Sequence, residues 1–239
     1  MIPWLTGDSA FPPLGQALTE PNGLLCAGGD LTPRRIVDAY RQGIFPWFSV
    51  GEPILWWSPD PRMVLFPAEF RVSRSLRRTL RAANYEVRLD SAFPEVIRAC
   101  AETPRPGQPG TWITREMQRA YRQLFELGIA HCVEVWVDGR LVGGLYGLAI
   151  GHMFYGESMF SRVSDASKIA TAHLARFLEA HGFGMIDCQM NTPHLASLGA
   201  HEIPRDAFIT RLRELVATDI QPGHLPDRWS IDGASQPWN

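Results

Sequence analysis

Hydrophobic residues recur along this chain at two spacings, which separate segments expected to be helices from segments expected to be strands. Apolar residues three and four positions apart predict helices over 33–42, 74–83, 90–103, 115–127, 165–181 and 205–216. Apolar runs and alternating patterns predict strands over 63–67, 85–90, 132–137, 140–150, 152–158 and 184–190. From residue 85 onward, the order β-α-α-β-β-β-α-β-α predicts an α+β fold with a mixed sheet.

Glycines refine the three central strands of this pattern. Asp138-Gly139 between the first two strands is a strong hairpin signal. The second strand contains Gly143, Gly144 and Gly147. Glycine inside a strand indicates a bulge or a close approach of another backbone, so we expect an irregular sheet there.

The first quarter of the chain is rich in Pro, Gly and Trp, and only one helix is predicted in it. Thr32 is the expected N-cap of that helix, and Gly43 marks its expected end. Trp56 and Trp57 are expected to pack in a core. Trp47 lies on a turn between Pro and Phe, and it fits a core position and a platform for a stacked base equally well.

The predicted helix over 74–83 carries arginines on one face. Ser73 can cap it, and its apolar stripe consists of Leu76, Leu80 and Ala83. At about 100° per residue, the opposite face carries Arg74, Arg77, Arg78 and Arg81. Guanidinium groups form bidentate bonds to phosphate, so this face suits a nucleic-acid backbone. A solvated face with nothing bound is an equally good explanation.

Two acids stand out in apolar surroundings. Glu157 lies within FYGESMFS, among aromatic and sulfur side chains, either as a local cap at a strand end or as part of a site. Asp187 and Gln189 alternate around Cys188 on a predicted strand, which places both on one face. They are either a buried hydrogen-bonded pair, or a site in which the carboxylate orients the amide and the amide positions an amine.

Composition narrows the classes of function. Hydrophobic residues make up 45% of the 239 residues and charged residues 20%, which is typical of a soluble globular protein. No apolar run approaches the ~20 residues of a membrane span, and MIPWLTGDSAF does not resemble a secretory signal. The four cysteines are scattered and the seven histidines form no metal-binding motif, so we expect reduced thiols and no metal site. With a net charge of −2, contact with nucleic acid must come from a local basic patch.

Seven motifs carry a resemblance to a known family. They are EPNGLLCAGGDLTPRRIVDAYRQGIFPWF, ILWWSPDPR, GTWITREM, GLYG, FYGESMFS, IDCQ and ASLGAHEIPR, and they extend over nearly the whole chain except the tail. Together they resemble the bacterial leucyl/phenylalanyl-tRNA–protein transferases. The resemblance implies a small N-terminal α+β domain over 1–62 and a GNAT-like acyltransferase domain over 63–239, with a mixed sheet flanked by helices.

The same resemblance implies an activity. The family transfers Leu or Phe, and also Met, from aminoacyl-tRNA to proteins with an N-terminal Arg or Lys. The transfer marks these proteins for degradation by the N-end rule pathway. We expect a monomeric cytoplasmic enzyme that needs no cofactor and binds no membrane.

The resemblance also implies roles for individual residues. Trp47 would stack on the terminal adenine of the tRNA, and Tyr40 and Trp112 would lie at the aminoacyl end. The aminoacyl pocket would be formed by Phe154, Glu157, Met159, Leu174 and Phe177. Asp187 and Gln189 would handle the attacking α-amine, and the four arginines of the predicted helix over 74–83 would bind tRNA.

Two other functions fit the sequence. GNAT acyltransferases hold the pyrophosphate of CoA with a glycine-rich loop at a helix N-terminus. The corresponding segment here, SRVSDASK, has no glycine and contains Asp165, which would repel phosphate. A CoA-dependent N-acyltransferase is therefore less favoured than aminoacyl transfer, and a non-catalytic tRNA-binding module is the third alternative.

Overall fold

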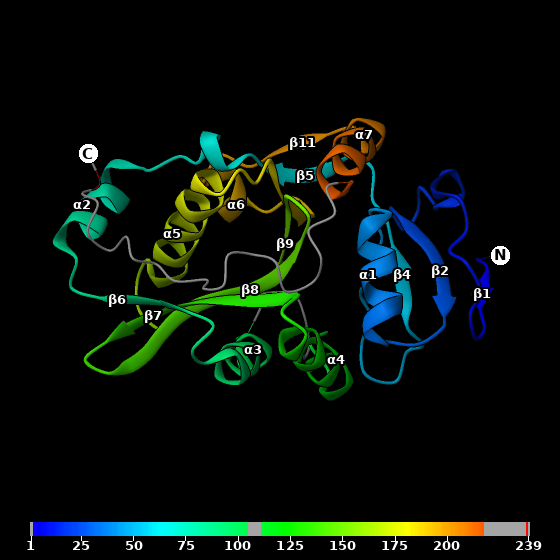
Figure 1. The fold of residues 1–239 in the computed structure, drawn as a ribbon, viewed down its shortest axis with the longest axis horizontal. Coiled ribbons are helices and arrows are strands. Elements are labelled where there is room, and N and C mark those ends of the chain that lie inside the picture. The colour runs from blue at the N-terminus through cyan, green and yellow to red at the C-terminus, as the bar shows by residue number, and fades with distance from the viewer. Residues whose placement is uncertain (1, 105–110, 218–237, 239) are drawn as a thin grey trace.

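The computed structural model describes residues 2–104, 111–217 and 238, and it contains two β-sheets (Figure 1). The smaller sheet has the order β1-β2-β4-β3 and lies in the N-terminal part of the chain. Its strands are β1 (Trp4–Leu5), β2 (Leu24–Gly28), β3 (Phe45–Pro46) and β4 (Leu55–Trp57). Helix α1 (Pro33–Arg41) connects β2 and β3, and a short 3₁₀ helix, η1 (Leu14–Gln16), precedes β2. Sequence analysis predicted α1 but none of these strands.

The larger sheet has seven strands in the order β11-β5-β10-β9-β8-β7-β6. The strands are β5 (Arg62–Leu65), β6 (Glu86–Leu89), β7 (Ala130–Val137), β8 (Arg140–Ile150), β9 (Met153–Ser161), β10 (Met185–Gln189) and β11 (His201–Ile203). β9 and β10 run parallel, and the other neighbouring pairs are antiparallel. The predicted α+β class with a mixed sheet is therefore confirmed, while the predicted division of the chain after residue 62 stays a prediction.

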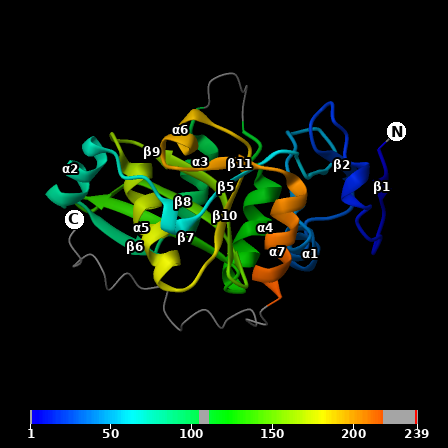
Figure 2. The same ribbon diagram turned by 90° about the horizontal axis from the view of Figure 1, so that it is seen from above.

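Helices cover both faces of the larger sheet (Figures 1 and 2). One face packs against α3 (Phe93–Glu102), α4 (Arg115–Glu126), α7 (Arg205–Val216) and α1, in one buried cluster that continues into the smaller sheet. The other face packs against α2 (Arg74–Ala82) and α5 (Ala166–Ala180) in a second cluster. The short helices η2 (Pro67–Glu69) and α6 (Pro193–Ser197) complete the described fold.

The predicted helix starts are confirmed where a side chain caps the backbone. The hydroxyls of Thr32, Ser73 and Thr114 each accept a hydrogen bond from the backbone N–H three residues later. One detail of the predictions is wrong. Ala83 is exposed and not part of the apolar stripe, because α2 ends there in a left-handed conformation.

Two of the bulges in the larger sheet lie in the neighbouring strands β9 and β10. Between β8 and β9, Tyr146 is opposite Ser158 while Gly147 is opposite Gly156, so Glu157 is the extra residue. The second bulge is in β10, where the register with β5 shifts after Asp187. The irregularity that the glycines of β8 predicted is thus confirmed.

The parallel pair β9 and β10 stays together over only three residues of each strand. Residues 153–155 pair with 185–187, whereas β9 continues to residue 161 alongside β8. Beyond this short pairing the two strands diverge. The candidate site lies where they separate.

Candidate active site

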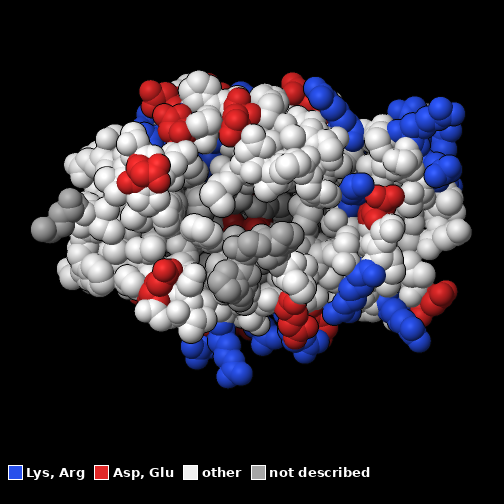
Figure 3. Space-filling view, turned by 180° about the vertical axis from the view of Figure 1, so that it is seen from behind, with Lys and Arg blue, Asp and Glu red and all other residues white. Residues whose placement is uncertain are grey.

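A cavity of about 270 Å³ opens between the diverging ends of β9 and β10. Its walls are mainly apolar and come from β9, β10, α5, α6 and the segment around β3. Figure 3 shows a hollow on this face, with an acidic surface at its bottom. Glu157 is the one Asp or Glu among the described residues that line the cavity.

Several of the predicted substrate-binding residues meet in this cavity. They are Trp47, Trp112, Phe154, Glu157, Met159 and Leu174. Trp47 and Trp112 are partly exposed, as aromatic rings available for stacking should be. The geometry is compatible with the predicted binding of a flat base and an apolar side chain, and their roles stay predictions.

Two of the predicted substrate-binding residues do not line the cavity. Phe177 is buried in the core beneath α5 and stacks on His181. Tyr40 is fully buried in α1 and reaches the cavity only through its hydrogen bond to Glu157.

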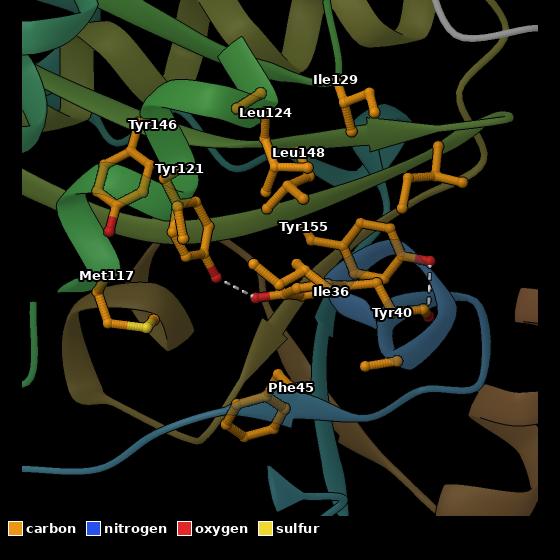
Figure 4. Close-up of a cluster of buried hydrophobic side chains, with 14 of the residues drawn as sticks. Ile36, Tyr40, Phe45, Met117, Tyr121, Leu124, Ile129, Tyr146, Leu148 and Tyr155 are labelled. Atoms are coloured by element: carbon orange, nitrogen blue, oxygen red, sulfur yellow. Dashed lines mark hydrogen bonds between the residues drawn. The ribbon is translucent and has the colours of Figure 1, made fainter. Parts of the chain in front are cut away.

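Glu157 is held by two buried tyrosines. Tyr40 Oη donates to Glu157 Oε1 over 2.6 Å, and Tyr121 Oη donates to Oε2 over 2.9 Å. Figure 4 shows the two phenols, from α1 and α4, pointing toward each other. Burial raises the pKa of Glu157 to about 7, although the two tyrosine hydrogen bonds lower it. Tyr121 lies in the predicted helix over 115–127, but the sequence did not indicate its contact with Glu157.

Asp187 forms a buried ion pair with Arg62. Arg62 Nε lies 2.8 Å from Asp187 Oδ1, and Arg62 Nη2 lies 2.6 Å from Oδ2. Both side chains are fully buried. The guanidinium group also donates to the carbonyl of Gly43 and lies over the rings of Phe45 and Phe208. Arg62 was missed from the sequence, although an arginine at the start of the apolar run RMVLF was a signal for a buried partner.

The prediction that Asp187 and Gln189 share one face of the strand is wrong. Gln189 has a left-handed backbone, with φ of 56°, at the bulge of β10. The bulge breaks the alternation, so Gln189 lines the cavity whereas Asp187 lies against Arg62 outside it.

Asp187 orients the backbone of Gln189, because its Oδ1 accepts the Gln189 N–H over 2.9 Å. Gln189 lines the cavity, and its buried Nε2 has no hydrogen-bond partner among the described residues. The predicted contact between the carboxylate and the side-chain amide is therefore absent. The catalytic roles of both residues stay predictions.

His194 is a further cavity residue that sequence analysis did not place. It lies in α6, and its Nε2 has no partner in the described part of the chain. Burial, with a smaller effect of Lys168, lowers the pKa of His194, so the ring is neutral near pH 7.

The four arginines of α2 are exposed, as predicted for that face. Figure 3 shows basic side chains gathered over α2, at the end of the molecule away from the smaller sheet. Arg81 Nε also donates to the carbonyl of Trp238 over 2.7 Å. The predicted contact with tRNA stays a prediction.

Residues 2–104 and 111–217 contain neither a metal-binding cluster nor a membrane-spanning helix. Within these ranges no group of three or more His, Cys, Asp or Glu side chains could hold a metal ion. No described helix is long and apolar enough to cross a membrane.

Comparison with known proteins decides the family. The family model described as leucyl/phenylalanyl-tRNA protein transferase matches residues 64–213, and the model of its N-terminal domain matches residues 29–60. The chain belongs to this family. The resemblance recognised in the sequence motifs is confirmed, and the chain is an aminoacyltransferase.

Similar proteins cover nearly the whole chain. The leucyl/phenylalanyl-tRNA–protein transferase of Nitrosospira multiformis is 66% identical over 216 residues, which are 90% of this chain and 93% of the relative. The protein of the same name from Azoarcus sp. is 61% identical over 240 residues, covering both chains completely.

Solved structures resemble the fold more distantly. FemX has a TM-score of 0.45 at 11% identity, covering 71% of this chain and 66% of FemX. A GCN5-related N-acetyltransferase from Kribbella flavida has a TM-score of 0.36 at 14% identity, covering 70% of this chain and 59% of the acetyltransferase. Similarities at this level carry no argument about function.

Proposed function

We propose that this protein transfers Leu or Phe, and also Met, from aminoacyl-tRNA to the α-amine of proteins with an N-terminal Arg or Lys. The new N-terminal residue marks the acceptor for degradation by the N-end rule pathway. The apolar cavity with two tryptophans, in a member of this family, is the observation that carries the proposal. We further propose that the enzyme works as a monomer in the cytoplasm.

The proposed reaction depends more on positioning the amine and the ester than on activating the ester. The ester between amino acid and tRNA is already activated, so neither ATP nor a cofactor is required. The amine attacks the ester carbonyl and an amide forms. Holding amine and ester in the reactive geometry can contribute roughly 7–11 kcal/mol to lowering the barrier.

Different cavity residues would bind the end of the tRNA, the transferred side chain and the attacking amine. Trp47 and Trp112 would hold the terminal adenine and the aminoacyl end, and the apolar walls would accept the Leu, Phe or Met side chain. The side-chain carbonyl oxygen of Gln189, which lines the cavity, would accept a hydrogen bond from the attacking amine and so position it. Asp187 would act through Gln189, by fixing its backbone.

A transfer assay tests this proposal. Phe-tRNA, Leu-tRNA, Met-tRNA and acetyl-CoA, each labelled in the transferable group, are offered with peptides beginning with Arg, Lys or Ala. We expect labelled product only from the charged tRNAs and only on the Arg and Lys peptides. Product from acetyl-CoA would overturn the proposal in favour of a CoA-dependent acyltransferase. Binding of tRNA without any product would favour a non-catalytic tRNA-binding module.

The arginine face of α2 gives a second test. We expect Arg77→Ala combined with Arg78→Ala to weaken tRNA binding and to reduce the slope of log affinity against log salt by about 2, because each arginine that neutralises a phosphate adds about 1 to that slope. A matched control is Arg211→Ala combined with Arg213→Ala, two exposed arginines on α7. Equal affinity of the α2 variant and the wild type, measured by filter binding across salt concentrations, would contradict a role of this face.

A further inference from the structure

Three oxygen-bearing side chains from α1, α4 and β9 meet beside the cavity. Tyr40 Oη lies 2.6 Å from Tyr121 Oη and 2.6 Å from Glu157 Oε1, and Tyr121 Oη lies 2.9 Å from Glu157 Oε2. All three separations are hydrogen-bond lengths. Tyr40, Tyr121 and Glu157 together form a proton ring.

The proton ring has three oxygen–oxygen contacts, but the two phenols supply protons for only two of them. Burial raises the pKa of both Tyr40 and Tyr121 well above the ordinary value, so each phenol stays neutral and carries one proton. An ionised Glu157 can only accept hydrogen bonds. Two protons then serve three contacts, and one pair of oxygens is left without a proton between them. A proton on Glu157 supplies the missing hydrogen bond and closes the ring.

The surroundings of Glu157 place its protonation equilibrium near neutral pH. Burial is the main cause that raises its pKa to about 7, while Asp187 raises it and Arg62 lowers it to a smaller extent. No Lys or Arg among the described residues forms an ion pair with Glu157. The other titratable groups around it are Tyr146 on β8, Tyr155 on β9, Asp187 and Cys188 on β10, Arg62 on β5 and His194 on α6.

We propose that the proton ring is the general base of the transfer reaction and takes a proton from the α-ammonium group of the acceptor. This step rests on the proposed function, which supplies the amine and the ester. An N–H bond of the ammonium breaks, its proton goes to Glu157, and the electron pair stays on nitrogen. The neutral amine attacks the ester carbonyl and the C–N bond forms. The C–O bond to the ribose then breaks, and the ribose oxygen takes a second proton from the attacking nitrogen.

Glu157 suits this role for three reasons. Taking up the proton completes the third hydrogen bond of the ring, so the tyrosines hold Glu157 in place before and after the transfer. The α-amine of a protein has an ordinary pKa of about 7.7–8.0, and a base whose pKa lies close to that of the group it deprotonates transfers protons efficiently. Among the described residues that line the cavity, Glu157 is also the one Asp or Glu.

An infrared titration of the free protein tests the ring without the transfer reaction. A protonated carboxyl group and a carboxylate absorb at different frequencies, and subtraction of the Glu157→Gln spectrum assigns the bands to this residue. We expect the protonated band to persist at pH 6, where an ordinary glutamate with a pKa of about 4.3 is ionised, and to disappear around pH 7 to 8. A carboxylate band of Glu157 at pH 6 would overturn the proposal.

Two tyrosine variants show whether the ring sets this midpoint. Tyr121→Phe removes a hydrogen bond that favours the ionised form, so we expect the midpoint to rise by about one pH unit. Tyr155→Phe is the matched control, because that buried phenol donates to the carbonyl of Tyr40 and not to Glu157. A midpoint that moves equally in both variants would contradict the ring.

The pH dependence of kcat/KM tests the catalytic step. For an Arg-starting peptide, we expect Glu157→Gln to lose about 100-fold at pH 7, where the amine is mostly charged. At pH 9 the amine is already neutral, so the loss should shrink to less than about tenfold. An equal loss at both pH values would mean that Glu157 only shapes the site. A wild-type protein without transfer activity would contradict the proposed function and the catalytic step, while the infrared titration would still decide the protonation of the ring.

Discussion

Replacing Arg62 with Met should lower the free energy of unfolding by about 3–5 kcal/mol, which is the usual effect of removing one partner of a buried ion pair. Asp187 is fully buried, and Arg62 binds both of its carboxylate oxygens. In the variant, the backbone N–H of Gln189 still donates to that carboxylate, but no cation balances its charge. The substitution also removes the guanidinium group from between Phe45 and Phe208. Urea unfolding followed by circular dichroism measures the effect.

Two controls separate the loss of the ion pair from the loss of side-chain volume. Arg211→Met breaks an exposed pair with Glu214 and should change stability by less than about 1 kcal/mol. Arg62→Met combined with Asp187→Leu removes both charges, and we expect it to recover most of the stability that the single variant lacks. A double variant as unstable as Arg62→Met alone would show that packing of the guanidinium group, and not the unpaired carboxylate, causes the destabilisation.

Gly147→Ala should impair both stability and activity. A Cβ atom at residue 147 would lie 2.1 Å from the carbonyl oxygen of Tyr155 and 2.6 Å from the ring of Phe154. Overpacking of this kind typically costs about 1–3 kcal/mol. Because the obstacle is the backbone of β9, relief of the clash should move the adjacent bulge that carries Glu157. A misplacement of about 1 Å in a site can reduce the rate about 100-fold.

Thermal unfolding and the transfer assay measure the two effects of Gly147→Ala. The matched control is Gly15→Ala, because a Cβ atom there meets nothing within 4 Å and the backbone is not left-handed. We expect Gly15→Ala to behave as the wild type in both measurements. Wild-type transfer by Gly147→Ala would show that β9 adjusts without moving Glu157.

Much of the fold follows from local signals in the sequence. Thr32, Ser73 and Thr114 fix helix starts because each hydroxyl meets a free backbone N–H within one turn. Asp138-Gly139 fixes the hairpin between β7 and β8 for an equally local reason. In the smaller sheet, β1, β3 and β4 were missed because they have only two or three residues, too few for an alternating pattern. β2 was missed although it is as long as β10, which was predicted.

The candidate site depends on contacts between distant residues, which local patterns do not report. Strand periodicity placed Asp187 and Gln189 on one face, and the bulge that separates them depends on pairing with β5. Arg62 directly precedes the predicted strand over 63–67 and Tyr121 lies in the predicted helix over 115–127, and neither local pattern indicates a partner far along the chain. The resemblance to the family identified Glu157 and the two cavity tryptophans as candidates, but it did not indicate which groups would hold Glu157.

The polar contacts of the site join segments that the ribosome makes at very different times. The hydrogen bonds of Glu157 to Tyr40 and Tyr121 span 117 and 36 residues, and the Arg62–Asp187 pair spans 125. A protein is made from its N-terminus, and contacts between distant segments form late in folding. On the ribosome, Tyr40 of α1 therefore finds its partners only after α4 and β9 have emerged, and Arg62 of β5 meets Asp187 only after β10 has emerged. Until then Arg62 is a charge without its carboxylate, and the growing chain has no finished cavity to bind tRNA.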